Sequence, residues 1–203
     1  MCIRDSLQSK VNPHFLYNSL NSIAGLAQED PVKTEEMAIA LSHFYKLSTN
    51  RQGEHWNTIE EALELLQTYL GIEKIRFGDR LQFDIQCPEF LKEEKIPRFL
   101  IQPLVENAIK YGYQASTNSM TIRLELEKID NQLLIRLFDQ GPPFPDNLQS
   151  GYGVQSVQKK LELLYPDQHE LAFINIPEKH VVITLSVSAI LSQQENQKTR
   201  KNN

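Results

Sequence analysis

The hydrophobic period of the chain changes near Gly78-Asp79, and this change constrains the fold more than any other feature of the sequence. Before it, apolar residues recur every three or four positions, which is typical of amphipathic helices. After it, strictly alternating segments are separated by helical ones. We therefore predict an α+β protein. An all-helical unit over residues 7–78 is followed by an α/β unit over residues 79–190, in which helices lie on one face of a mixed sheet.

Three helices are predicted in the first unit. The first covers residues 7–28 and is interrupted near its start by Pro13, because proline disturbs a helix interior. The second begins at about Thr34. The third begins at Thr58, which forms a capping-box pattern with Glu61 three residues later.

The second unit is predicted to contain five strands and two helices, joined by a loop rich in proline and glycine at residues 140–151. In chain order these are strand 81–87, helix 98–111, strands 120–126 and 132–138, helix 153–165, and a hairpin of strands 170–176 and 180–187.

The two ends of the chain differ from the rest. Residues 1–6 have no periodicity and run directly into a strong motif, so we expect a non-native start and a missing N-terminal part. Residues 191–203 are polar, and we expect a disordered tail. No apolar stretch of about 18 residues could span a membrane. We expect the chain as given to be cytoplasmic, and the full-length protein to lie at the cytoplasmic face of the inner or plasma membrane through its missing segment.

Composition excludes some classes of protein. The net charge of -5 gives no basic surface for direct nucleic acid binding. The two cysteines, Cys2 and Cys87, have neither metal-ligand spacing nor the pattern of a disulfide framework. Cys87 continues the alternation of Leu81, Phe83 and Ile85, so it is predicted to be a buried strand residue.

The segment 12–18, Asn-Pro-His-Phe-Leu-Tyr-Asn, contains a candidate nucleophile. A neutral imidazole such as that of His14 can attack near neutral pH. Asn18 lies one helical turn further on the same face, where it can hydrogen-bond the imidazole or a water beside a phosphohistidine. The alternative is a histidine packed at a helix bend without chemistry, and spacing alone does not separate the two.

Residues 96–112 are apolar on one side of a helix but also carry Glu106, Asn107 and Lys110. An asparagine oxygen is a hard ligand suited to Mg²⁺, and Lys110 offers a positive charge to a phosphate. The alternative is a surface ion pair between Glu106 and Lys110, which would contribute only tenths of a kcal/mol.

A third group of polar and glycine residues begins where a predicted strand ends, at Asp139. A carboxylate there can accept a hydrogen bond from the exocyclic amine of adenine, and Gly141 permits a sharp turn. Gly151 and Gly153 open a helix, whose free N–H groups favour phosphate. The alternative is a simple turn followed by a loose loop.

Together these segments resemble the LytS-like family of sensor histidine kinases, whose catalytic domain has the GHKL, or Bergerat, ATP-binding fold. The resemblance covers about residues 7–188. Residues 12–18 are similar to the phosphoacceptor motif of the family and residues 102–108 to its N box. The two glycine boxes of the family are similar to Asp139-x-Gly141 and Gly151-x-Gly153.

The resemblance implies a histidine kinase that uses ATP and Mg²⁺. His14 would accept the phosphoryl group, Glu106 would orient groups at the γ-phosphate, and Asn18 would help to hydrolyse the phosphohistidine. Asn107 would coordinate Mg²⁺. The other nucleotide-binding positions implied are Lys110, Tyr111, Asp139, Gly141, Gly151, Tyr152, Gly153 and Val154.

Two departures from the family pattern are present. Tyr111-Gly112 stands where the family usually has His-Gly, which puts the role of Tyr111 in doubt. The loop after Gly141 contains Pro142-Pro143-Phe144-Pro145 without a further glycine, so a short, restricted lid is expected.

The resemblance also implies partners. The family dimerises through its helical unit, and the apolar face of residues 16–26 is the candidate contact. The phosphoryl group passes to an aspartate of a response regulator, which in many cases binds DNA. An inter-domain hinge is expected near residues 78–80.

Two other functions are consistent with parts of the sequence. A GHKL ATPase or a protein-serine kinase would account for the second unit but would leave residues 12–18 unexplained. A non-catalytic dimeric adaptor would have no need of Asn107, Asp139 and Gly153.

Overall fold

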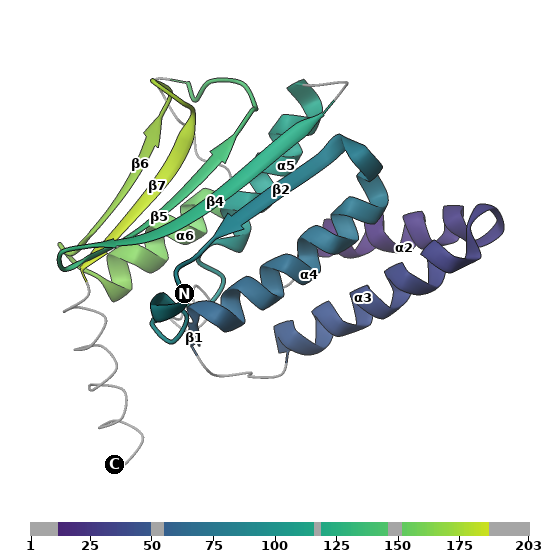
Figure 1. The fold of residues 1–203 in the computed structure, drawn as a ribbon, viewed down its shortest axis with the longest axis horizontal. Coiled ribbons are helices and arrows are strands. Elements are labelled where there is room, and N and C mark those ends of the chain that lie inside the picture. The colour runs from purple at the N-terminus through teal and green to yellow at the C-terminus, as the bar shows by residue number, and fades with distance from the viewer. Residues whose placement is uncertain (1–11, 50–54, 116–118, 146–151, 187–203) are drawn as a thin grey trace, which may run out of the picture.

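The helices and strands of the computed structural model carry the labels of Figure 1. The expectations for residues 1–6 and 191–203 lie outside the described part of the chain, which comprises residues 12–49, 55–115, 119–145 and 152–186. In chain order the elements are α2 (Pro13–Glu29), α3 (Pro31–Thr49), β1 (Trp56–Thr58), α4 (Ile59–Phe77), β2 (Leu81–Gln86), β3 (Lys95–Pro97), α5 (Gln102–Ala115), β4 (Met120–Ile129), β5 (Gln132–Asp139), α6 (Tyr152–Leu164), β6 (His169–Ile174) and β7 (His180–Ser186), with short 3-10 turns at Gly78–Arg80 and Glu89–Leu91.

Two prolines start helices. Pro13 is the first residue of α2, and the part of the predicted helix that precedes it, residues 7–11, lies outside the described residues. Proline suits the first helical position because the N–H it lacks would have no intrahelical partner there. Asn12 is the N-cap, and its side chain accepts a hydrogen bond from the N–H of His14 at 3.0 Å. α3 likewise starts at Pro31, slightly before the predicted start at Thr34.

α2 and α3 form a hairpin that packs against α4 (Figure 1). An aromatic cluster joins the three helices, since the ring centroid of Phe15 lies 5.0 Å from that of Phe44 and 4.9 Å from that of Tyr69. Such pairs contribute about 0.5–1.5 kcal/mol beyond their burial. The opposite side of α2 stays open to solvent, where Tyr17 is 68% and Leu20 48% exposed.

The predicted capping box at the start of α4 is confirmed. The Thr58 hydroxyl accepts from the Glu61 N–H, and the Glu61 carboxylate accepts from the Thr58 N–H, both at 3.1 Å. α4 ends at Gly78, whose φ of 60° lies in the left-handed region that favours glycine. β2 begins directly afterwards at Leu81, so the change in hydrophobic period coincides with the change from helix to strand.

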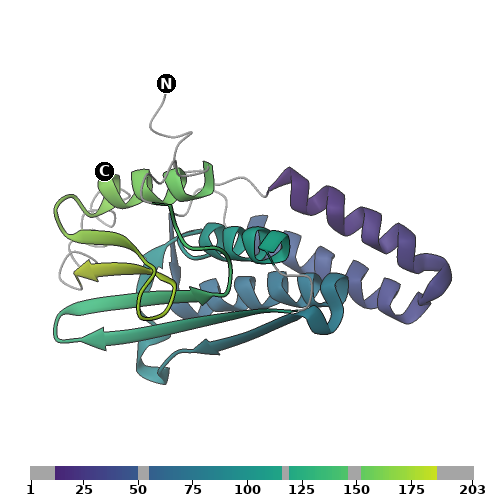
Figure 2. The same ribbon diagram turned by 90° about the horizontal axis from the view of Figure 1, so that it is seen from above.

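Five strands form one mixed sheet in the order β2-β4-β5-β7-β6. β2 runs parallel to β4, and the other neighbours are antiparallel. Figure 2 shows α5 and α6 on one face of this sheet. The predicted fold class is therefore confirmed: a helical N-terminal part followed by an α/β sandwich with helices on one face of a mixed sheet.

Alternate residues of β4 and β5 face the helices and are buried, as the alternation predicts. β2 departs from this pattern, because it is an edge strand with a neighbour on one side. Leu81 is fully buried, but Phe83 is 37% exposed. Cys87 lies beyond the end of β2 and is half-buried, so the prediction of a buried strand residue there is wrong.

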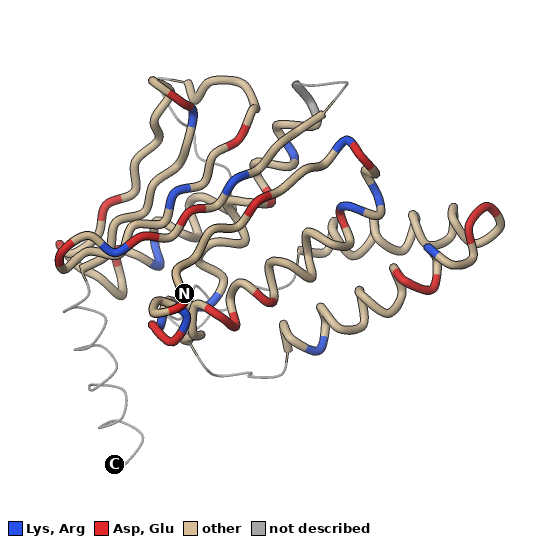
Figure 3. Tube along the Cα trace, viewed as in Figure 1, with Lys and Arg blue, Asp and Glu red and all other residues tan. Residues whose placement is uncertain are grey.

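The other face of the sheet is lined with charge pairs. Arg136 on β5 pairs with Glu127 on β4 at 2.9 Å, and Arg123 on β4 pairs with Glu178 at 2.8 Å. Figure 3 shows acidic and basic residues interspersed over the described chain rather than gathered by sign. This face is therefore a solvated one, as expected for a sheet covered on one side.

The small sheet of β1 and β3 was not predicted. These strands pair antiparallel, with Trp56 opposite Pro97. Each has three residues, too few for an alternating pattern to be recognised. The pairing joins the start of α4 to the segment before α5, and α5 itself begins at Gln102 rather than at residue 98.

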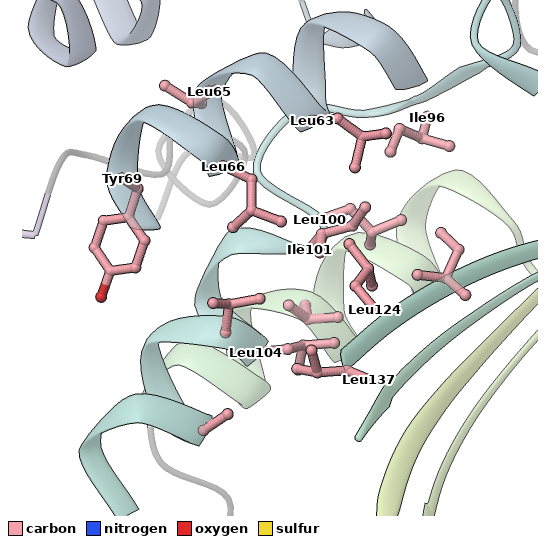
Figure 4. Packing of buried hydrophobic residues seen from close by; sticks show 14 of the residues in the cluster. Leu63, Leu65, Leu66, Tyr69, Ile96, Leu100, Ile101, Leu104, Leu124 and Leu137 are labelled. Carbon is pink, nitrogen blue, oxygen red and sulfur yellow. The ribbon is translucent and has the colours of Figure 1, made fainter. Parts of the chain in front are cut away.

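α4 is shared between the helical hairpin and the sandwich. Figure 4 shows Leu63 of α4 beside Ile96 of β3 and Leu66 of α4 facing Leu100, in the same cluster as Leu104 of α5 and Leu124 of β4. One hydrophobic cluster includes residues of the hairpin, of α4 and of the sandwich. The division into residues 7–78 and 79–190 remains a prediction.

Candidate nucleotide pocket and phosphoacceptor site

A pocket of about 230 Å³ lies where α5, the end of β5, the start of α6 and the β6–β7 hairpin meet. Its wall brings together three motifs that are far apart in the sequence, through Asn107, Asp139 and Val154. The full lining is Leu104, Asn107, Ala108, Tyr111, Leu137, Asp139, Pro142, Pro143, Phe144, Pro145, Val154, Phe173, Lys179 and Val181.

Asp139 is the acidic group of the pocket. It is the last residue of β5, between β4 and β7, and is 9% exposed. Its Oδ1 accepts hydrogen bonds from the Gly141 N–H at 2.7 Å and from the Lys179 ammonium at 2.5 Å. A Cβ on Gly141 would lie 2.7 Å from the same oxygen, so only glycine lets the backbone approach this carboxylate so closely.

The start of α6 approaches α5 through Gly153. A Cβ on Gly153 would lie 3.4 Å from Pro103 Cβ and 3.5 Å from the Asn107 amide nitrogen, which is ordinary van der Waals contact. The first turn of α6 therefore lies close to the amide of Asn107, although the space there does not by itself require glycine. Val154 follows and lines the pocket, buried at 8% exposure.

The predicted lid segment, residues 142–145, is bound to the β6–β7 hairpin by hydrogen bonds and a ring contact. Phe144 donates its N–H to the Asn175 side-chain oxygen at 2.8 Å and accepts from the Asn175 amide at 3.0 Å. Its ring meets that of Phe173 edge-on at 5.1 Å. The prolines and this clamp agree with the expectation of a restricted segment. Sequence analysis missed Phe173 and Asn175, whose alternating strand and turn carry no motif.

The remaining predicted nucleotide positions fall in different places. Tyr111 lines the pocket and is 43% exposed. Lys110 is exposed and lies outside the pocket wall, with its ammonium 5.4 Å from the Tyr111 ring. Tyr152 starts α6, and its side chain is not among those described. Gly151 lies outside the described residues.

Glu106 faces away from the pocket, toward the start of α2. Its carboxylate accepts from the Asn12 side chain at 3.1 Å and from the Gln102 side chain at 2.9 Å. The surface ion pair of Glu106 with Lys110 is therefore not formed in the described structure. Asn12 thus caps α2 with its oxygen and binds α5 with its amide, which joins the phosphoacceptor motif to the N box.

Burial gives Glu106 unusual electrostatics. The pKa of its carboxyl is raised because burial penalises the charged form, although the hydrogen bonds from Asn12 and Gln102 oppose this. Glu73 of α4 also has a raised pKa through burial, opposed by Arg76. Between them, burial and these two acids raise the pKa of the Tyr69 phenol well above its usual range. A proton is therefore held more easily here than on an exposed carboxylate.

His14 lies on the surface, in the first turn of α2. Its Nδ1 is 3.0 Å from the Asn18 side-chain amide, the contact predicted from the four-residue spacing. The next residue, Phe15, is 4% exposed and belongs to the aromatic cluster. The His14 ring is therefore not packed against the core, and its role as a nucleophile stays a prediction.

The chain fits a metal ion that arrives with a nucleotide. Within the described residues, no three His, Cys, Asp or Glu side chains cluster as metal ligands. Mg²⁺ bound to phosphates needs only one or two protein ligands, and the amide of Asn107 lines the pocket beside the start of α6. This donor suits Mg²⁺ in type and in number.

The sequence and the fold of the chain are similar to those of known proteins. Residues 4–81 match the family model "Histidine kinase". The histidine kinase domain of a blue-light activated histidine kinase from Erythrobacter litoralis has the same fold, with a TM-score of 0.53 at 16% identity, covering 86% of this chain and 83% of that one. The fold of the chain is thus that of a histidine kinase domain.

Two sequence relatives narrow the class further. The sensor histidine kinase BtsS of Escherichia coli is 32% identical over 180 residues, which cover 88% of this chain and 32% of that protein. The sensor protein LytS of Oceanobacillus iheyensis is 34% identical over 143 residues, which cover 70% of this chain and 24% of that protein. The chain belongs to the sensor histidine kinase family and resembles its LytS-like members. The chain spans about a third of the length of BtsS and about a quarter of that of LytS.

None of the described helices is both long enough and apolar enough to cross a bilayer.

Proposed function

We propose that this chain catalyses phosphoryl transfer from Mg-ATP to His14, and that the phosphoryl group then passes to an aspartate of a response regulator. The observation that supports this best is the convergence of Asn107, Asp139 and Val154 on one pocket. It is joined by the Asn12–Glu106 hydrogen bond, which brings the phosphoacceptor helix beside the N box.

The pocket is suited to the base of the nucleotide. Its volume of about 230 Å³ is below the ~300–1,000 Å³ typical of pockets for whole ligands. The apolar wall would cover the base, and Asp139 would accept from its exocyclic amine. The phosphates would lie toward Asn107 and the first turn of α6, where free N–H groups favour anions. Asn107 would hold Mg²⁺, which supplies neutralisation of the phosphate charge.

His14 would act as the nucleophile through Nε2. The Asn18 amide nitrogen lies 3.0 Å from Nδ1. With this amide turned by 180°, its oxygen would accept from Nδ1–H and the lone pair would stay on Nε2. The P–Nε2 bond then forms while the bond from the γ-phosphorus to the bridging oxygen breaks, and ADP leaves with that electron pair. The Nδ1 proton stays on the ring beside Asn18, which stabilises the phosphohistidine cation.

Glu106 would act by position rather than on the phosphate itself. Its hydrogen bond to Asn12 holds the first turn of α2 against α5, so the nucleophile and the nucleotide belong to adjoining elements. The exposure of His14 leaves its ring accessible to a second protein. The transfer is tested by adding a receiver domain to the phosphorylated chain. We expect the chain to lose its label to this domain, and to keep it when the aspartate of the receiver domain is replaced by asparagine.

A homodimer through the open face of α2 also fits the proposal, because Tyr17 and Leu20 are exposed apolar residues on that helix. The mass of the chain in solution tests this. A monomer at high concentration would contradict it.

The central experiment follows label from γ-labelled ATP and measures nucleotide binding in the same variants. We expect wild type to become labelled in an acid-labile, base-stable linkage. His14→Gln should bind ATP normally but take up no label, because it removes the acceptor alone. Asp139→Asn should bind ATP at least about 100-fold more weakly, since a charge-assisted hydrogen bond is lost and Lys179 is left unpaired.

The matched control is His43→Gln. His43 is a second histidine of the helical hairpin, also exposed, with its ring 3.9 Å from Glu64. This variant should be labelled like wild type. Label that persists in His14→Gln would overturn the assignment of the acceptor.

A further inference from the structure

Lys179 is a charged residue of the pocket that no motif indicates. It lies directly before β7, and 13% of its side chain is exposed. Its ammonium pairs with Asp139 Oδ1 at 2.5 Å and lies 4.1 Å from the centroid of the Phe144 ring. The ion pair and the aromatic ring therefore fix the ammonium in the wall of the pocket.

The two oxygens of Asp139 are used differently. Oδ1 accepts from both Gly141 and Lys179, whereas no hydrogen bond within the described residues ends on Oδ2. A lysine ammonium has three donors and no acceptor, and one of them is used by Asp139. As far as the described residues go, the pocket thus offers an acceptor that has no protein donor, Oδ2, beside a donor, Lys179.

This pair matches an edge of adenine. The exocyclic amine of adenine is a donor, and the ring nitrogens N1 and N7 that flank it are acceptors. We propose that Lys179 contacts the base, donating to one of these ring nitrogens while Asp139 Oδ2 accepts from the amine. This inference rests on the proposed function, since it takes the ligand to be ATP.

The same geometry gives selectivity for the base. Guanine carries an oxygen at C6, which would place an acceptor against the carboxylate of Asp139. An unpaired acceptor facing a buried carboxylate is unfavourable. Guanine also carries a hydrogen on N1, so a Lys179 ammonium that contacts N1 would face a donor instead of an acceptor. Lys179 adds to the selectivity of Asp139 when N1 is the nitrogen it contacts, and it adds none through N7, which is an acceptor in both bases.

The test measures binding of ATP, 1-deaza-ATP and 7-deaza-ATP to the full chain. Wild type should bind one of the two analogues about tenfold more weakly than ATP, because that analogue lacks the contacted nitrogen. Lys179→Met should bind ATP about tenfold more weakly and should no longer distinguish ATP from that analogue. A lysine paired only with Asp139 would not change the ratio between nucleotides.

The matched control is Lys128→Met. Lys128 is a partly buried lysine that pairs with Glu94 at 3.3 Å, away from the pocket wall. It should keep both the affinity and the discrimination of wild type. Lys179→Met can fail to fold because Asp139 is left unpaired. In that case Lys179→Gln, which keeps a donor for Asp139, takes its place, and the same ratio of ATP affinity to analogue affinity is measured in it.

The outcomes separate this inference from the function on which it rests. Wild type that binds ATP and both analogues equally, or a Lys179 variant that keeps the wild-type ratio, would overturn the role of Lys179 alone. Wild type that does not bind ATP would overturn the proposed function instead.

Discussion

His14 and Asp139 have opposite surroundings, although the proposed reaction needs both. His14 is exposed in the first turn of a helix, and Asn18 is its described side-chain partner. Asp139 is buried at the end of a central strand and held by two hydrogen bonds. A nucleotide pocket built into the core is shaped before its ligand arrives, whereas an acceptor on the surface can meet first a nucleotide and then a second protein.

In the part of the chain that the structure describes, polar contacts at two places tie the helical hairpin to the sandwich, and the two places differ in burial. At the end of α3, the guanidinium of Arg98 donates to the carbonyls of Leu47 and Ser48 at 3.1 and 2.7 Å. Lys160 of α6 donates to the Arg98 carbonyl at 2.5 Å and is 3% exposed. The contact at the start of α2, between Asn12 and Glu106, is only partly buried. We therefore expect the Arg98 end to be fixed and the His14 end to be easier to release.

The largest expected effect is a loss of stability at Phe15, the residue next to His14, that substitution of His14 does not cause. Phe15→Ala should lower the free energy of unfolding by about 3–5 kcal/mol, because it removes a ring that touches Phe44 and Tyr69 in the core. His14→Gln should change it by less than about 0.5 kcal/mol, as is usual for surface positions. Denaturant unfolding of both variants measures the difference.

The control for this pair is Tyr17→Ala, an aromatic residue of the same helix that is 68% exposed. It should behave like His14→Gln. Equal losses of unfolding free energy in Phe15→Ala and Tyr17→Ala would contradict the orientation of α2, in which Phe15 faces the core and Tyr17 faces solvent.

The second prediction concerns Lys160 at the buried contact. Burial, and then the nearby charge of Arg98, lower the pKa of Lys160 from 10.5 to about 8. Between these two values the unfolded chain holds a proton that the native state has released, so native stability rises with pH in this window. The gain is absent below pH ~8, where both states are protonated. Lys160→Met should lack this rise, which we expect to be about 2–3 kcal/mol.

The test measures the free energy of unfolding from pH 7.5 to 10.5, and compares wild type with Lys160→Met at each pH. Lys159→Met is the control, since Lys159 is the exposed neighbour on the same helix, and its curve should run parallel to that of wild type. A Lys160→Met curve parallel to wild type would mean that Lys160 is not held in a buried setting.

Much of the fold could be predicted from the sequence because local signals decided it. The alternation of β4 and β5 and the capping box of Thr58 and Glu61 each depend on neighbours in the chain. What could not be predicted depends on distant neighbours. Phe83 alternates like a buried residue but lies on an edge strand, and the pairing of β1 with β3 joins short segments that carry no pattern.

The candidate site divides in the same way. Asn107, Asp139 and Val154 were predicted by motif and do meet in one pocket. Glu106 was expected at the phosphates but faces Asn12 instead, because its side of α5 lies against α2. Lys179 was missed altogether, since a lysine before a strand is indistinguishable in sequence from a solvated turn residue. Its position becomes clear only when β7 is placed beside Asp139.

The smallest expected effect concerns the contact between Asn12 and Glu106. Asn12→Ala should lower the free energy of unfolding by about 1–2 kcal/mol, because α2 loses its cap and Glu106 loses a donor. Asn12→Ser keeps a good cap but is too short to reach Glu106, so it should cost less than Asn12→Ala. Denaturant unfolding gives both values.

The two variants also separate the cap from the contact. The hydrogen bond from Asn12 lowers the pKa of Glu106, so its loss should raise that pKa further in both variants, as NMR titration of the Glu106 carboxyl would show. ATP binding should be unchanged, since Asn12 is not part of the pocket wall, while transfer to His14 should slow in both. If Asn12→Ser transferred as fast as wild type, the contact would serve only to cap α2, and the first turn of that helix would reach the nucleotide without help from α5.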